Sequence, residues 1–236
     1  LFLASMSVIA PFSALHYNPA SIPDVTEVII PPYDNIPPGD EKKYFARSPY
    51  NFAHVLLPED GDPDYQHSKA HLGHWMETGI LTEQKDPSVY LYHQNFEVYG
   101  KRHSRYSLMC AVLLHDFADA IIRPHENTFG KYKEDRLRIL TTTQCNLSHI
   151  FGMVKDPEGY LNTLYEKWAY EKPLLFGKTD EGVEHSVWRI SSRHTAPFVE
   201  FFADKPIYIV DGHHRYESFL MYARNVGAYQ KKDHPA

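Results

Sequence analysis

Five consecutive residues near the C-terminal end of the sequence combine four polar side chains with one glycine in a pattern suited to a phosphate site. They are Asp211, Gly212, His213, His214 and Arg215. The apolar run before them predicts a strand over residues 207–210, a turn at Asp211-Gly212 and a helix from about residue 213. The first turn of a helix presents unpaired N–H groups and a partial positive charge, which attract anions.

Each residue of this run has a chemical role in the predicted site. Gly212 permits a sharp turn and a close approach of the backbone to a ligand. Arg215 can donate two parallel hydrogen bonds to a phosphate, and the two histidines add further donors. Asp211 can hold a metal ion. We predict a phosphate-binding motif over residues 211–216, and the alternative is an ordinary strand–turn–helix connection.

A second polar group occurs earlier, after the apolar residues 120–122. Pro124 stiffens a loop that carries His125 and Glu126. A carboxylate beside an imidazole is typical of a general base with its orienting partner, so we predict that Glu126 and His125 are catalytic. Thr128 offers a hydroxyl group to a phosphate or a metal ion.

The helix predicted over residues 131–143 carries further charged side chains. We predict that Lys133 and Arg136 contact phosphate, and the alternative is a solvated helix face of mixed charge. Asp135 and Arg136 are adjacent in the sequence and project from different faces of a helix, so we expect no ion pair between them.

The sequence contains 15 histidines, which raises the question of a metal site. His67, His71 and His74 fall at i, i+4 and i+7 of a predicted helix, a spacing that can hold a metal ion, but a polar helix face is the favoured interpretation. No zinc-protease motif is present. The ion that we expect is Mg²⁺, which binds with substrate phosphates and one or two carboxylates, here those of Asp211 or Glu126.

The composition predicts an ordinary folded protein. Of the 236 residues, 43% are hydrophobic and 14% are aromatic, which excludes a disordered chain. The net charge of −6 argues against a nucleic-acid partner. Cys110 and Cys145 are expected to be reduced thiols, as in a cytoplasmic protein. No apolar run approaches the roughly 18 residues that a membrane helix needs, so no membrane partner is expected.

Hydrophobic periodicity and the positions of proline and glycine predict the secondary structure. Helices are predicted over residues 64–79, 131–143, 158–170 and 195–202, the first of them capped by Gly79. Strands are predicted over residues 7–15, 51–57, 147–154 and 207–210. Strand pairs are predicted between 89–96 and 106–114 around Tyr99-Gly100, and between 174–176 and 185–190 across 179–182. Four prolines make residues 29–39 a stiff loop.

This mixture of strands, hairpins and helices predicts an α+β fold with a mixed sheet and flanking helices. We expect one domain over residues 1–236. Because the chain ends soon after the helix predicted from residue 213, we expect it to be the N-terminal part of a longer protein.

Six short blocks give the sequence a family resemblance. They are Pro31-Pro32-Tyr33-Asp34, Ser48-Pro49-Tyr50-Asn51, His125-Glu126-Asn127-Thr128, Lys133-Glu134-Asp135-Arg136-Leu137, His185-Ser186-Val187-Trp188-Arg189 and Asp211-Gly212-His213-His214-Arg215-Tyr216. In this order they resemble the uncharacterised bacterial and archaeal family DUF1015. Members of that family are usually longer than this chain, which agrees with the expectation of a longer protein.

The Asp-Gly-His-His-Arg block also resembles the nucleotide-binding motif of the ParB/sulfiredoxin superfold. In free serine kinases of that superfold, such a block holds nucleotide phosphates and a glutamate accepts the serine hydroxyl proton. The resemblance implies a ParB/sulfiredoxin-like core, with Glu126 as the base and residues 211–215 around the phosphates and Mg²⁺. No cysteine lies between residues 206 and 225, which argues against sulfinic-acid reduction. No helical DNA-binding module is visible, which argues against DNA clamping of the ParB type.

Two functions of different classes follow from these expectations. The first is a kinase that uses ATP or ADP to phosphorylate free serine or a related hydroxyl compound. The alternative is a non-catalytic nucleotide-binding module that regulates a partner. A third interpretation, a phosphatase with His213 as its nucleophile, has less support, because nothing in the sequence orients that ring.

Overall fold

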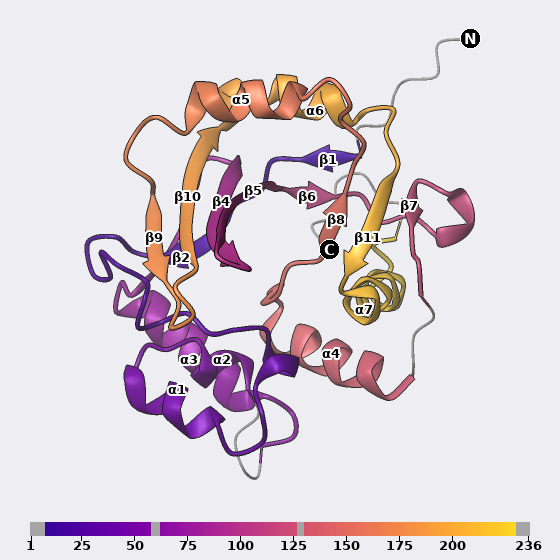
Figure 1. The fold of residues 1–236 in the computed structure, drawn as a ribbon. Coiled ribbons are helices and arrows are strands. Elements are labelled where there is room, and N and C mark those ends of the chain that lie inside the picture. The colour runs from indigo at the N-terminus through magenta and orange to yellow at the C-terminus, as the bar shows by residue number, and fades with distance from the viewer. Residues whose placement is uncertain (1–7, 58–61, 127–129, 230–236) are drawn as a thin grey trace.

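The computed structural model describes residues 8–57, 62–126 and 130–229, and these residues adopt an α+β fold (Figure 1). The α-helices are α1 (Glu41–Arg47), α2 (Ala53–Leu56), α3 (Gln66–Glu77), α4 (Gly130–Thr143), α5 (Tyr160–Trp168), α6 (Ala196–Phe202) and α7 (His213–Asn225). Short 3-10 turns cover Tyr33–Asn35, Phe117–Asp119 and Ser192–His194. The α+β class predicted from the sequence is therefore confirmed, and the ParB/sulfiredoxin-like core stays a prediction.

The described strands form four separate sheets. The strands are β1 (Ile9–Ala10), β2 (Leu15–Tyr17), β3 (Leu81–Glu83), β4 (Ser88–Val98), β5 (Lys101–Met109), β6 (Ala111–Val112), β7 (Ile122–Arg123), β8 (Phe151–Met153), β9 (Leu175–Lys178), β10 (Glu184–Ser191) and β11 (Ile207–Asp211). An antiparallel four-stranded sheet has the order β5-β4-β10-β9, and a three-stranded sheet has the order β7-β11-β8. Two short pairs, β1-β6 and β2-β3, complete the described β structure. The mixed pairing that the sequence predicted occurs in the three-stranded sheet.

One face of the four-stranded sheet forms a hydrophobic core with α5 and α6, which lie together beyond the ends of β4 and β10 in Figure 1. Side chains alternate between the two faces of a strand, so Val89 and Leu91 of β4 point into this core together. Phe198 of α6 packs against them and is fully buried. Each such side chain contributes about 1.5–3 kcal/mol by leaving water.

A second core fixes α7 against the three-stranded sheet. It contains Ile122 of β7, Ile209 of β11, and Tyr216 and Leu220 of α7. The Tyr216 hydroxyl donates to the carbonyl of His115 at 2.9 Å and accepts from its N–H at 2.9 Å. The first turn of α7 is thus held at one edge of this sheet.

Two predicted strands differ from the structure. Residues 53–56 form α2 instead of a strand, and the Asn51 side chain, just before the N-cap residue Phe52, accepts from the N–H of Ala53 at 3.0 Å and supports the turn into the helix. The strand predicted over residues 7–15 is interrupted after Ala10, before Pro11, and the chain then forms β1 and β2, which pair with different strands.

Other predicted elements are confirmed. The hairpin of β4 and β5 turns at Tyr99 and Gly100, where both residues have positive φ. The pairing of β9 with β10 and the start of α7 at His213 also agree with the sequence pattern. The two cysteines are not bonded to each other. Across the described ranges, every helix is too short or too polar to span a bilayer.

Candidate active site

Three chain segments meet at one edge of the three-stranded sheet. Strands β7 and β11 are parallel, with Ile122 opposite Ile207, so residues 124–126 and 211–215 both follow carboxyl ends at the same edge. Strand β8 runs antiparallel to β11, so residues 148–149 reach this edge just before β8 begins. The carboxyl ends of parallel strands are a common location for ligand sites.

The first turn of α7 has the geometry of an anion site. Gly212 has a φ of 94°, a left-handed conformation that glycine adopts without strain. The N-cap residue, Gly212, has no side chain that could cap this end of the helix, and the first helical bond runs from the N–H of Tyr216 to the carbonyl of Gly212 at 2.9 Å. The N–H groups that precede it are therefore directed towards the sheet edge, as in known phosphate sites.

The structure brings together two residues that the sequence placed in separate motifs. The carboxylate Oε1 of Glu126 lies 2.9 Å from Nδ1 of His213, whose side chain is 1% exposed. The His125 N–H donates to Nε2 of His213 at 3.3 Å, so Nε2 is unprotonated and the neutral ring carries its proton on Nδ1. Burial lowers the pKa of His213 despite the opposing effect of Glu126, which favours this neutral form.

The contact between Glu126 and His213 is short but poorly aligned. Nδ1 of His213 makes no hydrogen bond of acceptable angle to any residue in the described ranges. The buried N–H is therefore not fully satisfied, and its burial removes His213 as an accessible nucleophile, which argues against the phosphatase interpretation. Glu126 itself is half exposed, at 53%, so its other oxygen can reach a ligand.

His125 has a different neighbour from the one expected. Its Nδ1 lies 2.8 Å from the carbonyl of Ile209 and donates to it, and its ring meets that of His213 edge-on, with centroids 4.5 Å apart. Among the described residues, the ring in contact with Glu126 is that of His213. His125 therefore contributes through its backbone N–H and through packing.

Arg215 connects all three parts of this edge. Its guanidinium pairs with Asp211 and donates to the Ser148 hydroxyl at 2.6 Å and to the carbonyl of His149. A Cβ atom on Gly212 would lie 3.0 Å from the Arg215 guanidinium, so this group folds over the glycine. A phosphate at Arg215 would meet a guanidinium that is already fixed in position. Sequence analysis did not identify Ser148 or His149 as site residues. It placed both in the strand predicted over residues 147–154, whereas β8 begins at Phe151.

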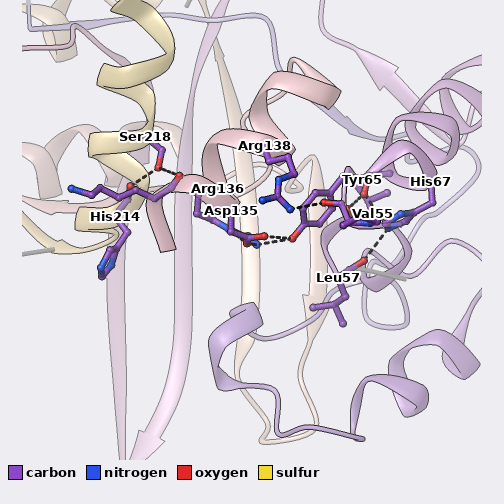
Figure 2. Close-up of polar contacts among 12 residues, drawn as sticks. Val55, Leu57, Tyr65, His67, Asp135, Arg136, Arg138, His214 and Ser218 are labelled. Carbon is purple, nitrogen blue, oxygen red and sulfur yellow. Dashed lines mark hydrogen bonds and ion pairs between the residues drawn. The ribbon is translucent and has the colours of Figure 1, made fainter. Parts of the chain in front are cut away.

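The two other predicted phosphate ligands lie along α4. Lys133 pairs with Glu217 of α7 at 2.7 Å. The hydroxyl of Ser218 donates to the carbonyls of Lys133 and His214, at 3.0 and 2.8 Å, and ties the two helices together (Figure 2). Lys133 therefore faces α7, the helix that carries the candidate site.

Arg136 lies on the other side of α4, away from α7 (Figure 2). It is 7% exposed, pairs with Asp135, donates to the Tyr65 hydroxyl at 3.2 Å and sits 4.1 Å from the centroid of the Tyr33 ring. The expectation of no ion pair between Asp135 and Arg136 is therefore wrong. A long arginine side chain can fold back along the helix, and a buried guanidinium requires a carboxylate partner.

The metal predictions have limited support from the geometry. The described residues contain no group of three histidine, cysteine, aspartate or glutamate side chains that could hold a metal ion. His67 is mostly buried and contacts Asp62 at 2.7 Å and the carbonyl of Leu57 at 3.0 Å. His71 packs on the Trp75 ring, so these two histidines pack inside the protein and do not form the polar helix face that we favoured. Mg²⁺ fits only as an ion carried by phosphates with one carboxylate, such as that of Asp211. Thr128 lies outside the described residues.

The family comparison covers nearly the whole chain. The model of the family described as "Protein of unknown function (DUF1015)" matches residues 9–236. No curated protein and no solved structure is detectably similar to this chain. Since the family match exceeds half of the sequence, the chain belongs to the DUF1015 family, and its function has to be argued from its own site.

Proposed function

We propose that this protein is a kinase that transfers a phosphoryl group from a nucleotide, ATP or ADP, to a small hydroxyl compound. Free serine is the first acceptor to test, because of the resemblance to serine kinases of the ParB/sulfiredoxin superfold. The observation that carries the proposal is the position of Glu126. Its Oε1 lies 2.9 Å from the buried His213 ring, at the uncapped start of α7.

This arrangement supplies the groups that phosphoryl transfer needs. The N–H groups of the first turn of α7 hold the nucleotide phosphates, and their fixed dipoles favour the charge of the transferring group. Lys133 and Arg215 add positive charge near this turn. Mg²⁺ would neutralise charge on the phosphates, and we expect the Asp211 carboxylate, which pairs with Arg215 in this structure, to hold it.

Glu126 acts as the general base in this proposal. The acceptor hydroxyl gives its proton to the carboxylate while its oxygen forms a bond to the terminal phosphorus. The bond from that phosphorus to the bridging oxygen breaks, and the nucleotide leaves with one phosphate fewer. The neutral His213 ring lies 2.9 Å from the carboxylate and does not neutralise it, because its proton stays on the nitrogen.

A second function is favoured by one specific observation. Arg215 is held by Asp211, Ser148 and the carbonyl of His149, which is typical of a structural brace. A non-catalytic module that binds a nucleotide and regulates a partner needs the helix terminus but no base. In either case, the two unpaired thiols fit a reducing compartment, and we propose that the protein is cytoplasmic.

Phosphorus NMR separates the two functions. The protein is incubated with Mg²⁺, ATP or ADP, and L-serine, beside a sample without serine. The kinase proposal expects a phosphomonoester signal that requires serine and is lost in Glu126→Gln, while that variant still broadens the nucleotide signals. Glu166→Gln, an exposed change on α5, is the matched control and keeps full turnover.

Two results would count against the kinase. Turnover that survives in Glu126→Gln would remove Glu126 as the base. Nucleotide binding without turnover, across serine and other hydroxyl compounds, would favour the regulatory module instead.

A further inference from the structure

The four-stranded sheet has a polar face on the side opposite α5 and α6. Val89 and Leu91 of β4 point towards those helices, so the alternation of β4 places Tyr92, Gln94 and Phe96 on the other face. The strand register sets Gln94 directly between Arg105 of β5 and its other partner, His185 of β10. His185 belongs to a sequence block for which the proposed kinase assigns no role.

Arg105 is held rigidly on this face. Its Nε and Nη2 donate to Oε1 of Gln94 at 2.8 and 2.5 Å. Its guanidinium carbon lies 5.7 Å from the centroid of the Phe96 ring and 5.1 Å from that of Phe151. A neutral amide and two rings fix the orientation of the guanidinium, and no carboxylate in the described ranges forms an ion pair with it. The result is a positioned guanidinium whose charge no described carboxylate contacts directly.

Tyr92 and His185 form a further polar contact next to Gln94 and Arg105. The Tyr92 hydroxyl and Nδ1 of His185 are 2.6 Å apart, and their rings are stacked. Burial, and then the charge of Arg105, lower the pKa of His185, so its ring is neutral and accepts the hydroxyl proton at Nδ1. This pair fixes the sheet face on which Gln94 and Arg105 lie.

A groove of about 300 Å³ opens beside this guanidinium. It is lined by Gln94, Phe96, Glu97, Arg105, Glu181 and Val183. Phe151, which packs on Arg105, is the register partner of Asp211, so the groove adjoins the candidate active site. In Figure 1, β4 and β5 face β8 across the middle of the molecule.

We propose that this groove binds the acceptor of the kinase as a small zwitterion, with its carboxylate on Arg105 and its ammonium group near Glu97 and Glu181. The role of this ligand as the phosphoryl acceptor depends on the proposed kinase function, whereas its binding depends only on the residues of the groove. A guanidinium binds a carboxylate through charge-assisted hydrogen bonds. The two glutamates repel a highly charged nucleotide phosphate and favour a ligand that also carries a positive group.

Ligand-observed NMR without nucleotide tests this proposal. The probes are L-serine, L-threonine and L-homoserine, compared with L-serinamide, which lacks the carboxylate, and N-acetyl-L-serine, which lacks the ammonium group. At least one zwitterion binds the wild-type protein, and the two blocked analogues bind at least tenfold more weakly. Arg105→Gln weakens that binding by roughly 10- to 100-fold, as expected for a lost charged hydrogen-bonding pair.

Arg138→Gln is the matched control. Arg138 lies on α4, is 44% exposed and does not line the groove, so its loss leaves zwitterion binding unchanged. The proposal is overturned if no zwitterion binds, if Arg105→Gln retains the wild-type affinity, or if L-serinamide binds as well as L-serine.

Phosphorus line broadening of ATP, measured on the same samples, keeps this proposal separate from the kinase. Arg105→Gln leaves the broadening unchanged. Loss of the broadening in Arg105→Gln would assign Arg105 to the nucleotide and overturn the zwitterion site. Zwitterion binding by a protein that does not bind ATP or ADP would refute the kinase and leave the groove assignment in place.

Discussion

Two acid–base pairs on either side of α4 show how similar residues come to have different roles. In the first pair the Arg136 guanidinium is 7% exposed, and the partly exposed Asp135 carboxylate, the Tyr65 hydroxyl and the Tyr33 ring surround it. Glu126 and His213 form the other, but the Glu126 carboxylate is half exposed and the buried Nδ1–H of His213 lacks an aligned acceptor.

The difference between the pairs lies in what remains unsatisfied. A guanidinium that is 7% exposed and bonded within the protein contributes to stability and presents little surface to a ligand. An uncapped helix start beside an exposed carboxylate has donors and an acceptor to offer. We therefore expect changes at Gly212 or Glu126 to affect binding or turnover, and changes at Arg136 to affect folding.

The largest expected effect on the binding side of this comparison is that of Gly212→Ala. The left-handed φ of 94° strains an alanine, and the added Cβ would lie 3.0 Å from a guanidinium that three neighbouring groups hold in place. We expect a loss of about 1–3 kcal/mol in the free energy of unfolding and a roughly tenfold or greater loss of nucleotide affinity. Urea unfolding and equilibrium binding of ATP measure the two effects.

Gly79→Ala is the control for Gly212→Ala. Gly79 has a φ of 73°, and nothing lies within 4 Å of an added Cβ, so it carries the backbone strain without the contact to Arg215. We expect a similar loss of stability and unchanged affinity. Equal loss of affinity in both variants would show that the effect of Gly212→Ala is a general loss of folding.

Features that depend on a few adjacent residues could be predicted from the sequence. The strand–turn–helix at 207–213 was predictable, because an apolar run, an Asp-Gly dipeptide and an amphipathic segment follow one another. The hairpin at Tyr99-Gly100 was predictable for a similar local reason. Both predictions depend on a few adjacent residues.

Contacts between distant segments were not predictable from local patterns. Strand β7 has only two residues, yet its parallel pairing with β11 brings Glu126 to His213. The sequence placed Arg136 among the phosphate ligands because its charge was visible and its burial against Tyr65 and Tyr33 was not. The seven-residue run 51–57 contains alternating and continuous apolar residues, so its periodicity could not distinguish a strand from the helical turn that Asn51 supports.

The stability side of the comparison is tested by Arg136→Met. Methionine retains apolar volume but loses the ion pair and the bond to Tyr65, so we expect a loss of about 1–3 kcal/mol in the free energy of unfolding. The affinity for ATP should be unchanged, since the guanidinium lies on the side of α4 away from α7. Arg138→Met is the control, because that side chain is 44% exposed, and it should change stability by less than about 0.5 kcal/mol. A weakened affinity in Arg136→Met alone would restore Arg136 to the phosphate site.

The smallest expected effect is the pH dependence that His213 contributes to stability. Burial holds the pKa of His213 below its ordinary value of 6.5, although Glu126 and Asp211 oppose the shift. Below about pH 6.5 the unfolded chain takes up a proton that the folded ring does not, so this contribution to stability is present above pH 6.5 and is lost as the pH falls.

Urea unfolding at pH 7.5 and pH 5.5 measures this effect. His213→Asn removes the titrating group while keeping a side chain that can donate to Glu126 and accept from His125. We expect the loss of stability between the two pH values to be smaller in the variant than in the wild-type protein, by less than about 1 kcal/mol. His74→Asn, an exposed change on α3, should leave the wild-type pH dependence unaltered. A variant with the wild-type pH dependence would mean that burial does not hold His213 neutral. The contrast between the Glu126–His213 pair and the Asp135–Arg136 pair would then lose its basis.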